Sequence, residues 1–458
     1  MKIINLNSDT DIGANSWFLE IDNYRLILDA GIHPKKEGFQ SIPMFKMVKD
    51  QEVDAIAISH CHHDHIGALP IAARYWPRAH ILVTDLSYFI AERVLHNSVN
   101  VMENKKTELG INDYPLYTHE EVDRLYPTIQ GFKYNTPIEW AAYHKTRAGM
   151  WSPVLEFFDA GHALGAAGIL VRGKKHTFFY TGDVCFRDQT ILKGAKFQGV
   201  RADIMLIETT RGARHSNEPY NREKEVQKFV KSLENALKRK ACVLIPTFAL
   251  GRTQEILGIL ALMTKEGRLN PQPIFIGGLG RVFTEIYDLQ AHRTRRRLPQ
   301  LQLRQELNLQ VLEREQILNM KFNKPHIFVL TAGMMNENTA AHELAVRLAG
   351  QEKQAIFFVG YADPDTPAGR MKVSKKGEPF FFSSSAGQLI RNCEMQDFDL
   401  TAHADRDDMI KFVGRVNPKV VLLGHGSDEA RAWFEEQIKK RYPKIKVIQP
   451  KPGEPVEI

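Results

Sequence analysis

The sequence predicts an α/β protein in which layers of sheet and helix are interrupted by an inserted domain. Short apolar strands alternate with turns and helix-period segments through roughly the first two hundred residues, and polar residues gather where those strands end. The middle third has a parallel α/β pattern of its own, and the earlier pattern of strands and histidines returns after about residue 386. A chain of 458 residues also exceeds the usual size of a single hydrophobic core, which favours two structural units.

The first strands are predicted as short runs rich in branched and aromatic residues, bounded by turn residues. They cover 17–21, 25–29, 54–58, 81–83, 155–159, 168–171, 177–180 and 204–208. Several of these runs end in Asp or Glu followed by Gly or another small residue. Such strand ends bring polar side chains to one edge of a layer, which is a common place for an active site.

The middle of the chain predicts a second, parallel unit. A charged segment of helical period at 222–240 leads into an apolar strand at 242–246, and the alternation then repeats. Further strands are expected at 273–277, 327–330 and 356–360. After these, 399–405 and 420–426 return to the pattern of a strand followed by histidine. The sequence contains no long linker, so an inserted domain fits better than two consecutive domains.

A cluster of metal-binding residue types follows the strand at 54–58. Four of them stand within six residues, in the order His-x-His-x-Asp-His: His60, His62, Asp64 and His65. A loop held at its base by a strand lets consecutive side chains fan out, so the first two can bind one cation while the last two reach a neighbouring one. Imidazole and carboxylate ligands at about 2.0–2.2 Å suit zinc. Cys61 and His63 occupy spacer positions and are not expected to be ligands.

Two neighbouring metal ions need more ligands than this cluster supplies, including a carboxylate that bridges them. Three candidates each follow an apolar strand and stand next to a glycine: His162, Asp183 and His425. Taken singly, each is explained equally well as a turn-capping residue or as a hydrogen-bonded side chain. Together they complete two coordination shells, so the sequence predicts two Zn²⁺ ions per chain.

Bulk properties exclude several other classes of protein. No stretch approaches the roughly 18 apolar residues of a membrane span, and the N-terminal residues lack the layout of a signal peptide. The cysteines, Cys61, Cys185, Cys242 and Cys393, are scattered, which indicates free thiols rather than a secreted disulfide framework. We therefore expect no membrane partner and a cytoplasmic location.

Positive charge gives only general information about partners. The net charge of +7 fits a polyanion-binding surface, although many proteins reach it without binding nucleic acid. Four arginines are concentrated in Arg293–Arg297. This run could clamp phosphate groups or could be a solvated basic face, and the two interpretations have equal weight.

In their order along the chain, these motifs resemble those of the metallo-β-lactamase-fold hydrolases of the β-CASP group. The resemblance covers essentially the whole chain and implies a metallo-β-lactamase αββα sandwich in two parts, 1–209 and 386–458, with a parallel α/β β-CASP domain inserted at 210–385. Three further stretches look like the family, namely Phe248–Arg252, Thr331–Met334 and Val359–Tyr361. No chemistry can be derived for them, and packing and tight turns are their expected roles.

The resemblance also implies a role for each candidate residue. Asp29, at the end of an apolar strand, looks like the family's first motif and would steady a ligand histidine. Glu208 would hydrogen-bond His403 and keep it protonated as the general acid for the leaving-group oxygen. The two zinc ions would have these ligands, with Asp183 as the bridge: His60, His62 and His162 for one ion, and Asp64, His65 and His425 for the other.

The activity implied by the resemblance is a zinc-dependent ribonuclease that hydrolyses single-stranded RNA, by endonuclease action, 5′-to-3′ exonuclease action or both. His425 at the third β-CASP motif is typical of members that process RNA rather than DNA. A homodimer is compatible with such a fold. Arg211 departs from the family, whose members often have Tyr at this position. Its side chain could meet phosphate or pair with a neighbouring acid, with equal weight.

Two alternatives belong to other functional classes. A small-molecule metallohydrolase on the same fold, such as a lactonase or thioester hydrolase, would share the metal ligands. It would have no use for Glu208, His403 or a large inserted domain. A non-catalytic RNA-binding scaffold would have lost metal ligands, and none is lost in this sequence.

Overall fold

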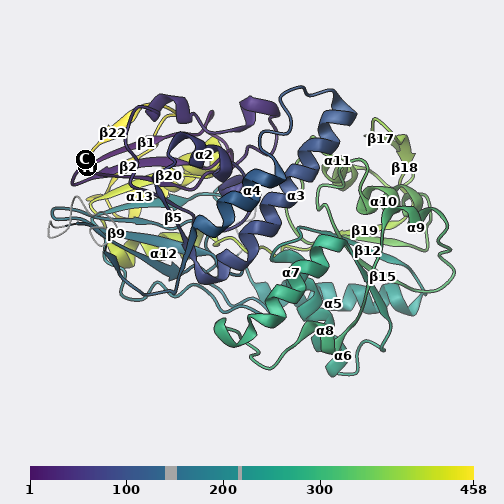
Figure 1. The fold of residues 1–458 in the computed structure, drawn as a ribbon. Helices are drawn as coiled ribbons and strands as arrows, with labels where there is room; N and C mark the ends of the chain where they lie inside the picture. Colours follow the sequence, from purple (N-terminus) through teal and green to yellow (C-terminus); the bar gives the residue numbers. More distant parts are fainter. Residues whose placement is uncertain (140–151, 215–218) are drawn as a thin grey trace. The chain divides into compact units, whose positions relative to one another are not determined.

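The computed structural model describes residues 1–139, 152–214 and 219–458 (Figure 1). These form two compact units. Unit 1 comprises Met1–Arg187, Gly194–Asn217 and His403–Ile458, and unit 2 comprises Asp188–Lys193 and Glu218–Ala402. The chain therefore leaves unit 1, builds unit 2 and returns, as expected for an inserted domain.

Unit 1 contains two seven-stranded sheets. The first has the order β22 (Pro455–Glu457), β1 (Lys2–Asn5), β2 (Trp17–Ile21), β3 (Tyr24–Leu28), β4 (Ala55–Ala57), β5 (His80–Thr84) and β6 (Ile129–Phe132). The second has the order β21 (Lys446–Ile448), β20 (Val420–Gly424), β11 (Ile204–Glu208), β10 (Thr177–Tyr180), β9 (Ala167–Arg172), β8 (Val154–Asp159) and β7 (Ile138–Glu139). Both sheets thus combine strands from the first half of the chain with strands from its last forty residues.

The apolar faces of the two sheets form one buried core. Trp17 and Leu28 of the first sheet belong to the same cluster as Phe157, Phe178 and Leu422 of the second. These strands are apolar on nearly every residue because both of their faces are covered. The termini meet in the first sheet, where Met1 and Ile458 exchange backbone hydrogen bonds of 3.0 and 3.1 Å.

Helices cover the outer faces of this sandwich. On the first sheet lie α2 (Leu69–Tyr75), α3 (Asp85–Leu109) and α4 (His119–Leu125), and α3 packs against β5 and β6. On the second lie α12 (Arg406–Val416) and α13 (Asp428–Arg441). The rings of Phe412 on α12 and Phe179 on β10 are 6.0 Å apart. The αββα order of layers agrees with the predicted fold class.

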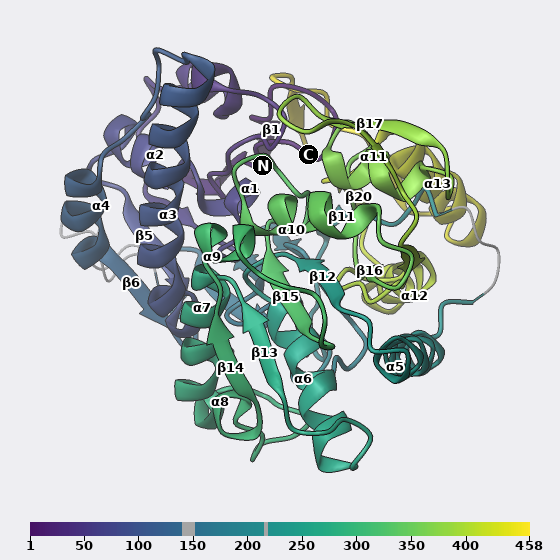
Figure 2. The ribbon, with the colours of Figure 1, turned by 90° about the vertical axis from the view of Figure 1, so that its right-hand side faces the viewer.

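Unit 2 is built on a six-stranded parallel sheet (Figure 2). Its order is β14 (Asn308–Val311), β13 (Pro273–Ile276), β15 (Ile327–Thr331), β12 (Val243–Thr247), β16 (Ala355–Phe358) and β19 (Glu394–Asp397). Around it lie α5 (Arg222–Lys238), α6 (Arg252–Lys265), α7 (Gly278–Leu289), α8 (Leu303–Glu306), α9 (Arg314–Leu318), α10 (Ala340–Ala349), α11 (Pro367–Val373) and the hairpin β17 (Pro379–Ser383)–β18 (Gly387–Ile390).

Both faces of the parallel sheet are covered. Leu344 of α10 shares a buried cluster with Phe328 on one face, while Phe229 of α5 lies 6.3 Å from the ring of Phe357 on the other. Helices on both faces are typical of parallel sheets joined by crossover connections. The predicted parallel α/β unit in the middle of the chain is therefore confirmed.

The segment 399–405 is not a strand, in contrast to the sequence prediction. Its backbone carbonyls accept from buried arginines instead of from a neighbouring strand: Arg252 donates to Leu400 and Arg222 donates to Thr401 at 2.8 Å. The segment ends where the carboxylate of Asp405 caps α12. The strand predicted at 420–424 is present as β20.

The three family-like stretches of unit 2 meet around one small hollow. Phe248 and Arg252, Gly333, and Gly360 with Tyr361 line it at the carboxyl ends of β12, β15 and β16. Carboxyl ends of neighbouring parallel strands lie at the same sheet edge, which brings together Arg252 and Gly333 although they are 81 residues apart. In the described parts of the chain, no helix combines the length and apolar character needed to cross a bilayer.

Candidate metal centre

The histidine cluster lies between the end of β4 and the short helix α1 (His63–Ile66) in unit 1. The loop after β3 holds this segment through its backbone, because Ala30 N–H donates to His65 O at 2.8 Å and Ile32 N–H donates to His63 O at 3.0 Å. The approach is so close that a Cβ on Gly31 would lie 1.7 Å from the carbonyl oxygen of Asp64. Only glycine permits this packing.

The first group of candidate ligands consists of His60, His62, His162 and Asp183. His62 Nδ1 lies 3.0 Å from His60 Nε2 and 3.1 Å from His162 Nε2. Asp183 Oδ2 lies 3.6 Å from His60 Nε2 and 3.7 Å from His162 Nε2. Side chains from three loops, which follow β4, β8 and β10, therefore converge on one point.

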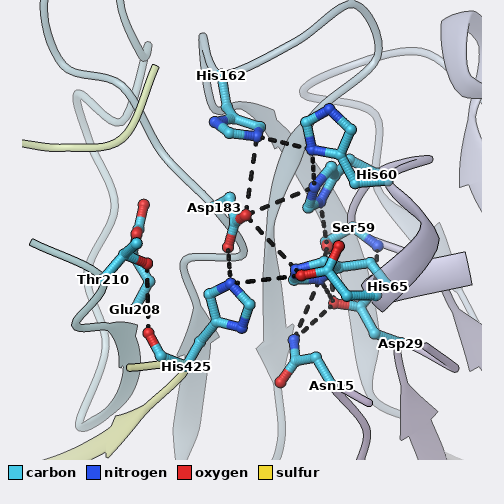
Figure 3. Close-up of polar contacts among 12 residues, drawn as sticks. Asn15, Asp29, Ser59, His60, His65, His162, Asp183, Glu208, Thr210 and His425 are labelled. Carbon is cyan, nitrogen blue, oxygen red and sulfur yellow. Dashed lines mark hydrogen bonds and ion pairs between the residues drawn. The ribbon is translucent and has the colours of Figure 1, made fainter. Parts of the chain in front are cut away.

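The second group consists of Asp64, His65 and His425. Asp64 Oδ2 lies 3.7 Å from His65 Nε2 and 3.8 Å from His425 Nε2. Asp183 faces this group as well, with Oδ2 3.5 Å from His65 Nε2 and Oδ1 3.4 Å from His425 Nε2. Figure 3 shows Asp183 in the middle of the surrounding imidazoles. It is the one carboxylate in contact with both groups in the described residues.

The positions of these ligand atoms are explained better by bound metal ions than by hydrogen bonds among the side chains. Three imidazole nitrogens of the first group meet, although His62 Nδ1 can accept only one N–H donor. Ligand nitrogens about 2.0–2.1 Å from a tetrahedral zinc are roughly 3.3 Å apart, close to the spacing of this group. Among the described residues, buried His65 Nε2 and Asp183 Oδ1 have no hydrogen-bond partner. Metal coordination would satisfy both atoms.

Asp183 carries a negative charge in this setting. Burial by itself raises the pKa of its carboxyl group, but the imidazoles of His425, His65 and His403 hold that pKa well below its usual range. The pKa of His60 is well below its usual range, because burial and the neighbouring His65 disfavour its charged form. Burial lowers the pKa of His65, but the nearby carboxylates, chiefly Asp183, raise it well above its usual range. Since ligand imidazoles must be neutral, a divalent metal ion would take the place of this proton on His65.

Asp29 holds His65 from behind. Its Oδ2 lies 2.8 Å from His65 Nδ1, so that the imidazole donates to the carboxylate with one nitrogen and directs Nε2 to the centre. Oδ1 of Asp29 also accepts from the backbone N–H of Ser59 at 2.6 Å. Asp29 is fully buried and has a φ of 61°, a left-handed conformation that is uncommon outside glycine and costs backbone strain.

Three residues around Asp29 were not identified from the sequence. Ser59 Oγ and the Tyr180 hydroxyl donate to Asp29 Oδ2 at 2.8 and 2.7 Å. Asn15 Nδ2 donates to the same oxygen at 3.3 Å and lies 3.1 Å from His65 Nδ1. Ser59 could have been suggested by its position beside His60. Nothing in the local sequence marks Asn15 or Tyr180.

Glu208 and His403 form a pair beside the centre. Glu208 ends β11, and its Oε2 lies 2.9 Å from His403 Nδ1 while its Oε1 accepts from Val184 N–H at 2.7 Å. His403 Nδ1 is also 3.9 Å from Asp183 Oδ2. Burial lowers the pKa of His403, but the charges of Glu208 and Asp183 outweigh burial and raise it above its ordinary value. The pair therefore favours a protonated imidazole.

Cys61 and His63, at the spacer positions of the motif, form hydrogen bonds with residues outside the candidate ligand groups. Cys61 Sγ donates to Ser87 O at 3.4 Å, and burial raises the pKa of its thiol to about 12. His63 Nε2 lies 2.6 Å from Ser98 Oγ, and burial lowers the pKa of His63 to about 4. Neither residue belongs to a candidate ligand group within the described ranges.

The sequence left open the roles of Arg211 and of the basic run Arg293–Arg297, and the structure gives these arginines different surroundings. Arg211 lies three residues after Glu208, and its charge opposes the raised pKa of His403. In the basic run, Arg296 is 3% exposed and donates to the carbonyls of Tyr287 and, at 3.0 Å, Leu301. Arg293 and Arg297 are exposed. The run is thus partly a packing element.

Comparisons with known families match three parts of the chain. Residues 9–213 match the metallo-beta-lactamase superfamily, residues 253–371 match the Beta-Casp domain, and residues 389–450 match the Zn-dependent metallo-hydrolase RNA specificity domain. The last segment contains both His403 and His425. The metallo-beta-lactamase superfamily is metal-dependent, in keeping with the clusters of histidine and aspartate.

Similar proteins extend over nearly the whole chain. "Probable RNase MJ4" of Methanocaldococcus jannaschii is 28% identical, with 100% of both chains covered. "Endoribonuclease ysh-1" of Neurospora crassa is 27% identical over 93% of this chain, and "Cleavage and polyadenylation specificity factor subunit 3" of Dictyostelium discoideum is 25% identical over 98%. The chain spans only 52% and 56% of the length of these two eukaryotic relatives.

A solved structure supports the fold alone. A protein of unknown function from Enterococcus faecalis V583 aligns over 100% of both chains with a TM-score of 0.58 and 15% identity. The matched domains and relatives specify the group. By these domains and their order, the chain belongs to the β-CASP group of the metallo-β-lactamase superfamily.

Proposed function

We propose that the chain is a zinc-dependent ribonuclease that hydrolyses phosphodiester bonds of single-stranded RNA. The observation that carries this proposal is the position of the Glu208–His403 pair, 3.9 Å from the carboxylate that lies between the two ligand groups. A proton donor next to a two-metal centre suits cleavage of a phosphodiester, since protonation of the leaving oxygen speeds its departure.

The metal ligands follow from the two groups. His60, His62 and His162 would hold one zinc ion, Asp64, His65 and His425 the other, and Asp183 would bridge them. Bound there, two zinc ions supply Lewis acidity and activate water at neutral pH. Asp29 contributes by fixing the orientation of His65, and Gly31 by letting the loop that carries Asp29 approach Asp64.

His403 would act as the general acid. Because its Nδ1 is engaged with Glu208 Oε2, the proton for the leaving oxygen would come from the other ring nitrogen, Nε2. The carboxylate of Glu208, itself held by Val184 N–H, keeps the ring oriented and favours its charged form. The guanidinium of Arg211, whose charge acts on His403, would attract a phosphate oxygen.

RNA is the substrate class favoured by the comparisons. The segment that carries His403 and His425 matches an RNA specificity domain, and the relatives bear the names RNase and endoribonuclease. A lactonase or thioester hydrolase is not favoured, since it would use neither the Glu208–His403 pair nor the inserted unit. We also propose action in the cytoplasm, supported by four buried free cysteines, and a homodimer as the quaternary state.

The test is cleavage of single-stranded RNA by the zinc-loaded protein and by H403A. Removal of the acid should lower the cleavage rate by about 10²–10⁴-fold while bound zinc, measured by atomic absorption, stays at the wild-type level. The control is H176A, which removes a histidine from the β9–β10 turn, and it should cleave normally. Efficient lactone hydrolysis by a wild-type protein that leaves RNA intact would falsify the proposal.

The mode of cleavage is tested separately on RNA labelled at its 5′ end, in 5′-phosphate and 5′-hydroxyl forms. Immediate release of mononucleotides would indicate 5′-to-3′ exonuclease action. Internal fragments from both forms would indicate endonuclease action, which the name of the Neurospora crassa relative favours.

A further inference from the structure

A second cluster of metal-binding side chains joins α3 to α4 in unit 1. Glu92 and His96 stand one turn apart on α3, and Asp123 and His119 stand on α4. One ligand atom from each of Glu92, His96 and Asp123 lies within 4.8 Å of the other two. The two helices run side by side in Figures 1 and 2, and none of these residues is a candidate ligand of the centre described above.

Hydrogen bonds outside this ligand group determine how His96 is protonated. His119 Nε2 lies 3.1 Å from Asn100 Oδ1, an oxygen that can only accept, so His119 carries a proton on Nε2. Neutral His119 then has a lone pair on Nδ1, which lies 2.8 Å from His96 Nδ1. His96 must donate from Nδ1, and a neutral His96 has its lone pair on Nε2.

That lone pair is directed at carboxylates. His96 Nε2 lies 3.2 Å from Asp123 Oδ1, and the carboxylate of Glu92 completes the group. Glu92 also has a distant ion pair of 3.9 Å with Arg93 on its own helix. Three acceptors that face one another repel unless a cation lies among them. The cation is either a proton on His96 Nε2 or a metal ion.

We propose that Glu92, His96 and Asp123 bind a third divalent transition-metal ion of the zinc class. The donor set of one imidazole and two carboxylates suits zinc, and water would fill the remaining position. Ligand histidines characteristically donate their second ring nitrogen to a fixed acceptor, which His119 provides here. Exposed fractions of 24% for His96 and 65% for Asp123 leave the site accessible to an ion from solvent.

The position of the cluster gives such an ion a structural role. Helix α3 supports two of the loops that form the candidate metal centre. Ser87 Oγ donates to Gly165 O at 3.0 Å, close to His162, and Ser98 Oγ lies 2.6 Å from His63 Nε2. An ion shared by α3 and α4 would brace this helix. The inference does not depend on the substrate of the enzyme.

The experiment counts zinc in the full-length protein. Wild type, H96A and D123N are saturated at micromolar Zn²⁺, dialysed and measured by atomic absorption, with H176A as the matched control. Wild type and H176A should hold one zinc ion more per chain than H96A and D123N. Equal zinc in all four proteins would overturn the proposal, because the proton alone would then account for the contact between His96 and Asp123.

A second variant examines the orienting residue. H119A removes the acceptor of His96 Nδ1 but no ligand, so it should bind the extra zinc about 10–100-fold more weakly in competition with a chromophoric chelator. The far-ultraviolet circular dichroism of each variant shows whether α3 and α4 remain folded, and the two exposed substitutions H96A and D123N should leave it unchanged. Wild-type affinity in H119A would contradict the assigned tautomer and with it the site.

Discussion

At the scale of single residues, Asp29 shows how a buried carboxylate orders a metal ligand without touching the metal. It accepts from Ser59 through both oxygens, from Tyr180, and from His65 Nδ1 at 2.8 Å. Every group around it donates, so its negative charge is matched by hydrogen bonds on all sides. The orientation of His65 thus depends on a residue thirty-six positions earlier in the chain.

The substitution D29N should weaken zinc binding by about 10–100-fold, because an amide presents donor hydrogens to groups that also donate. Zinc affinity measured by competition with a chelator checks this value. Y180F, which removes one donor to Asp29, should show a smaller loss in the same direction. The control is Y114F, which removes a hydroxyl that donates to Glu37, and it should bind zinc as wild type does. Unchanged affinity in D29N would mean that Asp29 has no part in orienting His65.

At the scale of elements, the centre is assembled by strand ends and the turns that follow them. β4 leads into His60 and α1, β8 into His162, β10 into Asp183 and β20 into His425. Because these strands belong to the two packed sheets of unit 1, their ends are held rigidly and the side chains converge. The turn after β3 is the tightest part of this assembly.

The substitution G31A tests whether the close packing of the turn after β3 against Asp64 is needed for stability and zinc binding. A methyl group at this position would clash with the carbonyl of Asp64, so α1 must shift. We expect the free energy of unfolding to fall by about 1–3 kcal/mol. We also expect the variant to bind less zinc. Urea unfolding and zinc content measure the two effects. In the control G350A no atom lies within 4 Å of the added methyl, and stability and zinc content should stay close to wild type. Full zinc retention in G31A would show that the loop adjusts without moving the ligands.

At the scale of the whole molecule, the chain passes between its units four times, at 187/188, 193/194, 217/218 and 402/403. The short piece Asp188–Lys193 is held in unit 2 by Glu255, whose carboxylate accepts from Thr190 N–H at 3.0 and 2.9 Å and pairs with Arg222. Arg252 donates to Gln189 in the same piece. Glu255 is 2% exposed, so this charge cluster is buried.

Glu255 should make stability depend on pH. Burial raises the pKa of its carboxyl group, but Arg222 and Arg252 outweigh burial and hold it below the ordinary value of 4.5. The carboxylate therefore stabilises the fold at pH above about 4.5, and this contribution is lost as the pH falls through the lowered pKa. Replacement of one member of such a buried pair costs about 3–5 kcal/mol.

The measurement is urea unfolding of wild type and E255Q at pH 7 and at pH 3.5. The variant should be less stable at pH 7, and the difference between the two proteins should shrink at the lower pH. The control is E266Q, which changes an exposed glutamate just after α6 and should follow wild type at both values. A constant difference at both pH values would show that Glu255 does not titrate with folding in this range.

The sequence by itself determined the strands and the local ligand cluster. Apolar runs such as 204–208 and 420–424 became β11 and β20, because runs of this length and composition are buried wherever a sheet forms. His60, His62, Asp64 and His65 are close in space because they are close in the chain. The partition of the candidate ligands between two zinc ions stays a prediction.

Only the tertiary structure decided the surroundings of these residues. Tyr180 donates to Asp29 from a strand 151 positions later in the chain. The segment 399–405 gives its carbonyls to Arg222 and Arg252, more than 140 positions earlier, instead of joining a sheet. The physical reason is common to both. A local pattern specifies how a segment folds and which side it buries, whereas the partner of a buried polar group is chosen by packing between segments far apart in the sequence.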